Sequence, residues 1–262
     1  MSLFTIGDLH LSLGVPSKPM NVFSGWENHM ELLEQNWREL ISPEDTVVLP
    51  GDTSWGMTLP EALADFQFIQ DLPGQKILLK GNHDYWWNSM KKMEEFLEAN
   101  GLDTLHILHN NHYPYGKYGI CGSRGWVNIG NEQEQSAKVL AREVQRLEVS
   151  ICSAEQAGLE PVVFLHYPPM FGSNCNYDIL DVLYRHHITR CYYGHIHGYS
   201  HRYAITGERD GIDFHMVSSD YLGFRPEFIF YLLIASATAF AISDAVIPAF
   251  PLFNAAISPA FP

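Results

Sequence analysis

Short apolar runs alternate with amphipathic helical patterns along the 262 residues of the chain. Runs of bulky and β-branched residues predict buried strands at residues 3–6, 46–49, 77–79, 161–165 and 190–193, and shorter patterns predict strands near 104–108, 118–121, 203–205 and 212–217. Apolar positions three or four residues apart predict helices over 26–41, from Thr58 to Pro73, and over 89–100, 132–151 and 177–187. This alternation favours one large α/β domain.

Each of the five strongest strand patterns is followed by side chains that can bind a metal ion. Because ligands of open α/β sheets bind beyond the carboxyl ends of the strands, we expect these side chains to converge. They are Asp8 and His10 after 3–6, Asp52 after 46–49, Asn82 and His83 after 77–79, His166 after 161–165, and His195 and His197 after 190–193.

The stretch from Lys80 to Asp84 places three side chains with possible roles in a site at consecutive positions. Gly81 is expected to permit a sharp turn. Asn82 then offers an amide oxygen to a metal, His83 a group that moves a proton, and Asp84 a carboxylate that orients His83. Taken by itself the stretch is equally consistent with a polar loop, and the other strand ends favour a site.

The types of candidate ligand indicate which metals to expect. A mixture of histidine, aspartate and asparagine without thiolate suits Mn, Fe or Zn, and the set exceeds what one tetrahedral ion needs. We therefore expect two divalent metal ions, held roughly 3.5–4 Å apart by a bridging carboxylate. Such a pair clamps the attacking and leaving oxygens in a displacement at phosphorus.

Composition limits the partners of the chain. Sixteen Lys and Arg residues against thirty Asp and Glu residues give a formal charge of −14. This charge repels nucleic acid and anionic membranes, so neither is expected as a partner. The four cysteines are widely spaced and form no C-x-x-C pair, and no signal-peptide pattern is present. These features predict reduced thiols and a cytoplasmic location.

The motifs Asp-x-His, Gly-Asp, Gly-Asn-His-Asp, His and Gly-His-x-His occur in this order along the chain. In this combination the sequence resembles the calcineurin-like metallophosphoesterase superfamily over about residues 3–220. The resemblance implies a four-layer α/β fold in which two packed mixed β-sheets are flanked by helices. One departure is that many members carry Gly-Asp-x-x-Asp at the second motif, whereas Gly51-Asp52 is followed here by Thr53-Ser54-Trp55.

The resemblance also assigns roles to the candidate residues. It implies that Asp8, His10 and His197 hold one metal, that Asn82, His166 and His195 hold the other, and that Asp52 bridges them. His83 would act as a general acid or stabilise charge near the leaving group, with Asp84 fixing its orientation. Hydrolysis would proceed through a metal-bridging hydroxide, without a covalent enzyme intermediate.

The substrate side is less defined by the sequence. Arg124, on the Gly-Ser-Arg-Gly-Trp stretch at a strand end, is a candidate to bind a phosphate oxygen bidentately, with a surface salt bridge as the alternative. His112, Tyr167, Asn174 and Asn176 are further candidates to line this side. We expect a small phosphorylated substrate. The competing interpretations are a catalytically silent metal-binding scaffold of the same fold and a nuclease.

The end of the chain departs from the family. We expect the phosphoesterase domain to cover residues 1–228, followed by an apolar tail at 229–262. The apolar stretch beginning at Phe228 is shorter than the roughly twenty residues that a membrane helix needs. The tail is therefore expected to pack on its own domain or on a neighbouring subunit of a homo-oligomer, and to take no part in catalysis.

Overall fold

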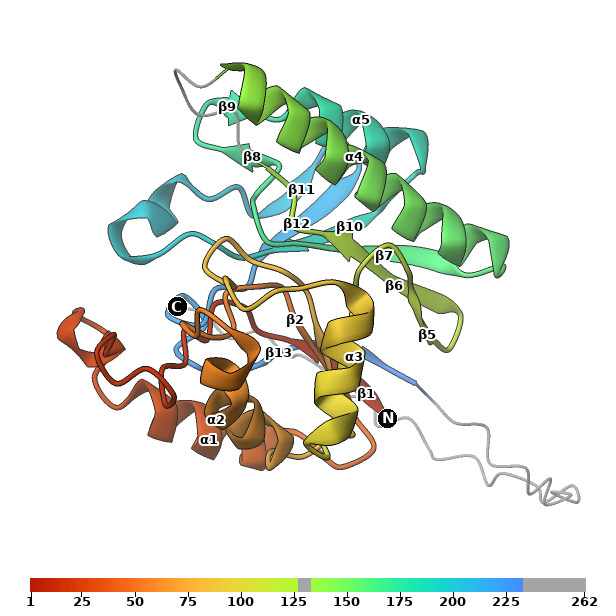
Figure 1. Ribbon diagram of the computed structural model, residues 1–262. Coiled ribbons are helices and arrows are strands. Elements are labelled where there is room, and N and C mark those ends of the chain that lie inside the picture. The colour runs from red at the N-terminus through yellow and green to blue at the C-terminus, as the bar shows by residue number, and fades with distance from the viewer. Residues whose placement is uncertain (127–132, 233–262) are drawn as a thin grey trace, which may run out of the picture. The chain divides into compact units, whose positions relative to one another are not determined.

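The computed structural model describes residues 1–126 and 133–232. Two β-sheets pack face to face, and helices cover the outer face of each sheet, so that the layers follow the order helix, sheet, sheet, helix (Figure 1). This architecture confirms the predicted fold of two packed mixed sheets flanked by helices.

The first sheet contains five strands and the second contains six. In spatial order the first sheet consists of β13 (Glu227–Tyr231), β1 (Ser2–Thr5), β2 (Thr46–Leu49), β3 (Gln75–Leu78) and β4 (Leu105–Ile107). The second consists of β11 (Gly207–Arg209), β12 (Ile212–Met216), β10 (Arg190–Tyr193), β7 (Glu160–Leu165), β6 (Tyr118–Ser123) and β5 (Tyr113–Tyr115). Neighbouring strands run parallel except for β13, β11 and β5, which lie antiparallel at sheet edges.

Helices from the two halves of the chain cover the two sheets separately. Those on the first sheet are α1 (His29–Leu40), α2 (Leu59–Gln70) and α3 (Met90–Ala99), and those on the second are α4 (Gln133–Gln156) and α5 (Tyr177–Arg185). Shorter elements are the 3-10 turns η1 (Met20–Val22) and η2 (Gly198–Tyr203) and the ribbon of β8 (Met170–Phe171) and β9 (Asn174–Cys175). Among the helices of the described ranges, none has the length and apolar character that crossing a membrane requires.

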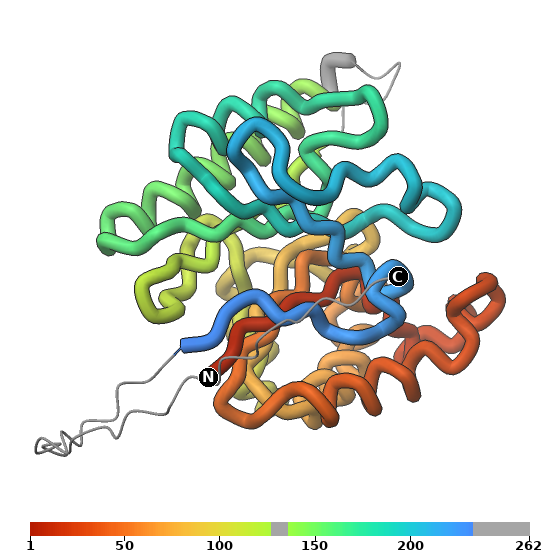
Figure 2. Tube along the Cα trace, turned by 180° about the vertical axis from the view of Figure 1, so that it is seen from behind, coloured from red at the N-terminus to blue at the C-terminus, as the bar shows by residue number. Residues whose placement is uncertain are grey.

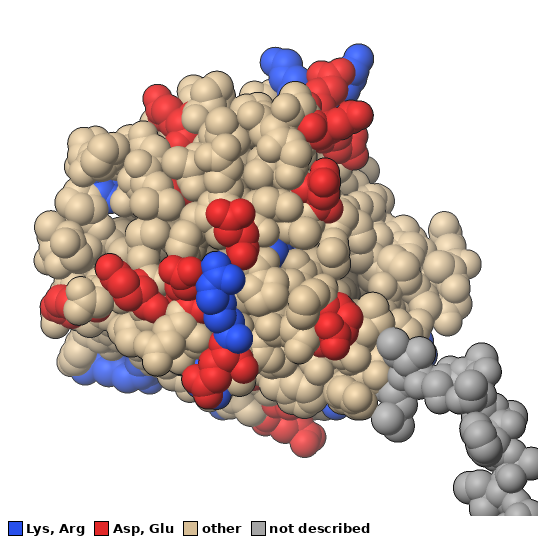
Figure 3. Space-filling view, turned by 90° about the horizontal axis from the view of Figure 1, so that it is seen from below, with Lys and Arg blue, Asp and Glu red and all other residues tan. Residues whose placement is uncertain are grey.

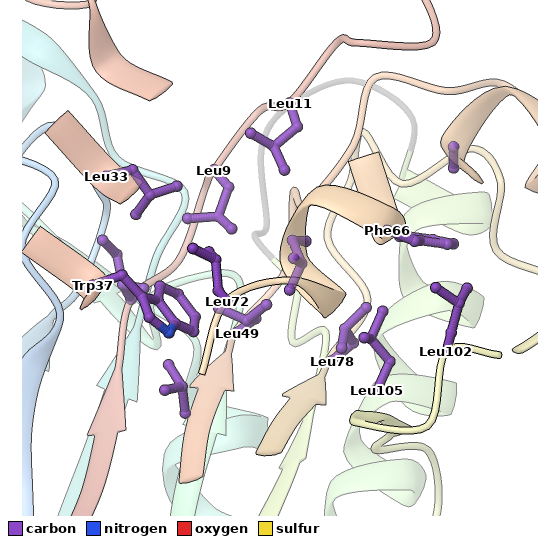
Figure 4. Close-up of a cluster of buried hydrophobic side chains, with 14 of the residues drawn as sticks. Leu9, Leu11, Leu33, Trp37, Leu49, Phe66, Leu72, Leu78, Leu102 and Leu105 are labelled. Atoms are coloured by element: carbon purple, nitrogen blue, oxygen red, sulfur yellow. The ribbon is translucent and has the colours of Figure 1, made fainter. Parts of the chain in front are cut away.

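The central strands of both sheets are mostly apolar because both of their faces are buried. Alternate side chains point to opposite faces, so Val47 packs against the helices while Val48 packs between the sheets. Phe164 and Val163 divide in the same way on β7. Figure 4 shows the core under the first three helices, where the labelled side chains from strands, helices and loops lie together.

The structure differs from the sequence prediction at the hairpin near residue 207. The strand expected at 203–205 is wrong, because the chain there leaves η2 and the strand forms at Gly207–Arg209. Asp210 and Gly211 both have positive φ, 51° and 82°, as a two-residue hairpin turn requires. This turn places Arg209 opposite Ile212 and thereby fixes the register of β11 on β12.

A strand crosses the boundary expected at residue 228. β13 continues through Tyr231 and pairs antiparallel with β1, and Figure 2 shows the two segments side by side. Phe230 enters the core between the sheets, where its ring stacks on Tyr118 at a centroid distance of 4.3 Å. The guanidinium carbon of Arg190 lies 4.6 Å from the centre of the same ring. The remainder of the expected tail, residues 233–262, lies outside the described residues.

We predict that Phe230→Ala lowers the free energy of unfolding by about 3–5 kcal/mol, the usual cost of truncating a buried aromatic side chain. The matched control is Tyr231→Ala, because the Tyr231 side chain is 62% exposed whereas Phe230 is 9% exposed. The control should lose less than about 1 kcal/mol. Urea unfolding of both variants measures the difference, and equal losses would show that β13 contributes through its backbone alone.

Candidate metal centre

The predicted ligands converge where the carboxyl ends of five strands from both sheets meet. Main-chain hydrogen bonds hold the strand-end loops in place. The amide of Asp8 donates to the Gly51 carbonyl at 3.0 Å, and the amide of His10 donates to the Asp52 carbonyl at 2.9 Å. The loops after β7 and β10 are joined in the same way, through Gly194 and His166 at 3.1 Å.

One group of donors consists of Asp8, His10 and His197, whose ligand atoms all lie within 4.8 Å of one another. The Nε2 atoms of the two histidines are 3.2 Å apart. His197 Nε2 lies 3.9 Å from Asp8 Oδ1. The first sheet therefore supplies two donors and the second sheet supplies the third.

A second group consists of Asp52, His166 and His195, with ligand atoms again within 4.8 Å of one another. Asn82 adds an amide oxygen, because its Oδ1 lies 2.7 Å from His166 Nε2. The two groups are adjacent. Asp52 Oδ2 lies 3.5 Å from His166 Nε2 and 3.8 Å from His10 Nε2, so this carboxylate lies between them.

The donors fit divalent cations. Asp8 Oδ1 is buried and has no hydrogen-bond partner among the described residues, and such an atom is costly unless a cation satisfies it. Carboxylate, imidazole and amide donors without thiolate suit Mn, Fe or Zn. Each group gathers donors from distant parts of the chain, so its formation depends on the folded arrangement of both sheets.

Three of the histidines are neutral near pH 7 and so have a lone pair for a metal. Burial lowers the pKa of His166 and of His195 to about 3, and it lowers the pKa of His10 well below its usual value. Neighbouring histidines add to these shifts. Deprotonated imidazole is the form that binds metal.

Asp220 supports the fourth histidine, and it was missed from the sequence. His197 Nδ1 lies 2.9 Å from Asp220 Oδ1, an arrangement that fixes the ring and directs Nε2 towards the site. Burial lowers the pKa of His197, but the bond to Asp220 and the charges of Asp8 and Asp220 outweigh it and raise the pKa to about 9. A cation bound here would therefore displace a proton from His197. His166 has a comparable support in the carbonyl of Pro50, 3.1 Å from its Nδ1.

Four of the candidate ligands have a strained backbone. Asp8, His10, Asp52 and His195 have φ values of 57°, 47°, 51° and 73°, in the left-handed region that residues with side chains seldom adopt. Each such residue costs about 1–3 kcal/mol and persists only when the surroundings enforce it. The strand-end hydrogen bonds enforce it here, and the strain aims the side chains into the site.

Glycines before the ligands allow close approach between strand ends. A Cβ on Gly81 would lie 2.1 Å from Asp52 Oδ1, and one on Gly194 would lie 2.4 Å from Asp8 Oδ2. Gly81 was expected to supply a sharp turn, but the contact with Asp52 is what excludes a side chain there. At Gly51 both the backbone conformation and the lack of space require glycine. Its φ is 94°, and a Cβ there would lie 2.7 Å from His166 Nδ1.

Asp84 has partners that differ from those expected. Its carboxylate accepts hydrogen bonds from the Trp86 indole and from main-chain amides of the β2 and β3 loops, at Asp52, Thr53, Ser54 and Gly81, over 2.7–3.3 Å. Among the described residues, His83 Nδ1 has no hydrogen-bond partner, and none of these bonds of Asp84 goes to the His83 ring, so the expectation that Asp84 orients His83 stays a prediction. Burial raises the pKa of Asp84 to about 7, and the amide donors oppose this rise.

His83 lies at the edge of the first group. Its amide donates to Asp52 Oδ1 at 2.7 Å, which ties its position to that carboxylate. Its ring packs against Trp55 at a centroid distance of 4.4 Å and lies 5.7 Å from the His10 ring. Burial lowers the pKa of His83.

The residues proposed for the substrate side are dispersed. Arg124 is 17% exposed and forms an ion pair with buried Glu143, 3.5 Å away. It is therefore neither an unpaired arginine nor part of a surface salt bridge. Tyr167 lies beside the ligands, with its ring 4.3 Å from that of His195. His112 instead bonds to Ser153 on α4, and Asn176 caps α5.

Fold and site together define a metal-dependent phosphoesterase. The sequence matches the family model described as calcineurin-like phosphoesterase over residues 1–199, and the chain belongs to this family.

Sequence similarity to a curated protein is local. The Gene 66 protein of Mycobacterium phage L5 is 35% identical over 77 residues, which are 29% of this chain and 37% of the phage protein. The match therefore spans well under half of that relative.

Solved structures share the fold at low identity. Phosphopantetheinyl hydrolase from Mycobacterium tuberculosis is 13% identical with a TM-score of 0.50, over 87% of this chain and 95% of that one. The protein TT1561 of Thermus thermophilus is 9% identical with a TM-score of 0.50, over 86% of this chain and 96% of that one.

We predict that Asp84→Asn weakens metal binding by roughly 10–100-fold, although Asp84 is not placed among the ligands. An amide would direct its NH₂ group at main-chain donors and shift the loops that carry Asp52 and Asn82. Competition with a chelator measures the affinity. Asp45→Asn is the control, because Asp45 is also buried and accepts main-chain amides, from Ser2 and Ser42, away from these loops. Unchanged affinity in folded Asp84→Asn would contradict this role.

Proposed function

We propose that the protein hydrolyses small phosphoesters with two divalent metal ions, one held by Asp8, His10 and His197 and the other by Asn82, His166 and His195. The observation that supports this most directly is the position of Asp52, whose Oδ2 lies 3.8 Å from a histidine of the first group and 3.5 Å from one of the second. A carboxylate in this place is suited to bridge two ions. When bound, such ions supply an activated water near neutral pH and positive charge for the phosphoryl oxygens.

The chain itself prepares the site for a phosphoryl group. Neutral rings of His10, His166 and His195 keep lone pairs directed inward, and Asp220 holds His197 in a fixed orientation. Main-chain hydrogen bonds join the short strand-end loops that carry the donors, so little reorganisation is needed when substrate binds.

His83 is the residue we assign to the leaving group. Its main chain is fixed by Asp52, while its ring nitrogen Nδ1 has no partner in the described part of the chain. The ring is thus positioned, and it lines the pocket beside the first donor group. In this role it donates a hydrogen bond or a proton to the oxygen on which negative charge develops.

A small substrate is favoured over nucleic acid. The formal charge of −14 disfavours a polyanion. On the face seen in Figure 3, acidic and basic side chains are interspersed and basic ones form no continuous stripe. A silent scaffold is disfavoured because the ligand positions and His83 are all filled by residues of the required chemistry.

We predict that Asp52→Asn loses both metal occupancy and activity, since a neutral amide cannot bridge two cations as a carboxylate does. Elemental analysis and turnover of a phosphate ester measure the two effects. Asp45→Asn is the matched control, because Asp45 is buried at the opposite end of β2 and lies in neither donor group. Two ions per chain and full turnover in Asp52→Asn would show that the bridging assignment is wrong.

His83→Ala is expected to retain both metal ions but to slow hydrolysis by roughly 10²–10⁴, the usual contribution of a positioned proton donor. The loss should shrink for esters with good leaving groups, which need less protonation. Comparing nitrophenyl and alkyl phosphates tests this dependence. An equal loss for both would assign His83 a role in positioning the phosphoryl group.

A further inference from the structure

A pocket of about 370 Å³ opens directly beside the first donor group. His10, His83 and His197 line it on the side of the metal centre. An ester whose phosphoryl group lies at the donors can therefore extend its organic group into this pocket. Because His83 also lines it, that group would be placed next to the residue assigned to the leaving oxygen.

The remaining walls are mainly apolar and aromatic. They are formed by Met20 from the η1 turn, Phe23 directly after it, Trp26, and Trp55 from the loop after β2, and Ser24 and Gly198 complete the lining. Trp55 occupies the stretch where the chain departs from the Gly-Asp-x-x-Asp pattern, so an indole stands close to where that pattern has a carboxylate. Among the wall residues, few groups are available to hydrogen-bond the hydroxyls of a sugar or polyol.

Most of the wall is fixed before a ligand arrives. Trp26 is 4% exposed and packs edge-on against Phe224 at a centroid distance of 5.2 Å. The Trp55 indole N–H donates to Met20 Sδ at 3.3 Å, and its ring stacks on His10 at 5.1 Å. A wall that is already ordered loses little entropy on binding.

Phe23 is the exception, because it is large, apolar and 55% exposed. It lines both this pocket and an adjoining hollow of about 300 Å³, which share Met20, Phe23 and Trp55. An exposed aromatic ring at the mouth of an apolar pocket gains from being covered by a ligand. Phe23 is therefore the residue whose removal changes binding with least effect on the metal centre.

Size and charge narrow the ligand further. The pocket lies at the small end of the roughly 300–1,000 Å³ range of ligand sites, so it suits a ring-sized group rather than a polymer. Lys18 is the one Lys or Arg that lines either hollow in the described structure, and its ammonium lies over the rings of Trp55 and Tyr85, at 5.3 and 5.9 Å. It is already bonded to the Trp55 carbonyl.

We infer that this pocket binds the organic group of the substrate and selects phosphoesters in which that group is apolar and about the size of an aromatic ring. The inference rests on the proposed phosphoesterase function, because the donor groups must hold the phosphoryl end. Beyond that function, the inference adds a preference for apolar over polar organic groups.

Calorimetric titration of the metal-loaded full-length protein with two phosphonates tests it. Methylphosphonate and phenylphosphonate carry the same phosphoryl group, and their carbon–phosphorus bond is not an ester that the site could hydrolyse. Phenylphosphonate should bind at least about tenfold more tightly, because its ring is removed from water. Phe23→Ala should remove most of this difference and leave the affinity for methylphosphonate unchanged.

Phe228→Ala is the matched control, because Phe228 is 53% exposed, close to the value for Phe23, and lies on β13 away from the pocket lining. It should keep the preference for phenylphosphonate. Equal affinities of the two phosphonates for the unmodified protein, or a preference that Phe23→Ala leaves intact, would overturn the inference while leaving the proposed function standing. Failure of both phosphonates and of inorganic phosphate to bind would instead count against the proposed function itself.

Discussion

Three carboxylates buried together, those of Asp8, Asp52 and Asp84, are the constraint on which the rest of the structure depends. Burial raises the pKa of each, to about 7 for Asp8 and Asp84 and about 6 for Asp52, because a charged carboxylate is poorly solvated away from water. Asp84 is compensated by five N–H donors. Asp8 and Asp52 have fewer, and divalent cations are the natural compensation for the remainder.

This constraint links the fold to the chemistry. Donors must come from strand ends of both sheets, which requires the sheets to pack with those ends together. Left-handed backbone at Asp8, His10, Asp52 and His195, and glycines where a Cβ would collide, are consequences of bringing the strand ends so close. Burial of apolar side chains in the core between the sheets offsets the free-energy cost of the strained backbone at these strand ends.

Much of the fold followed from sequence because each strand of the central pattern is apolar on both faces and ends in a glycine or polar motif. The donors could be named for the same reason. What could not be predicted depends on contacts between distant residues. Asp220 lies 23 residues beyond His197, and Asp84 accepts hydrogen bonds from amides about 30 residues earlier. The sequence around His197 or Asp84 does not reveal these distant partners.

Other differences between the sequence prediction and the structure arise from segments whose hydrophobic pattern is weak or ambiguous. The Asp210-Gly211 turn carried a recognisable hairpin signal, but the short strand before it, Gly207–Arg209, is polar and gives no periodicity. β13 was not predicted because most of it lies in a long apolar stretch that was interpreted as a tail. The pocket beside the first donor group depends on where the η1 turn lies, and loop positions are not encoded in hydrophobic periodicity.

The position of β1 between β2 and β13 has a consequence for the order of assembly in the cell. A ribosome delivers β13 more than two hundred residues after β1, so the sheet edge beside β1 stays open until β13 has been synthesised. His195 and His197, from the second sheet, also emerge late. A nascent chain therefore carries Asp8 and His10 for a long interval without their partners, and the cation site can close only after the loop that follows β10 has been synthesised.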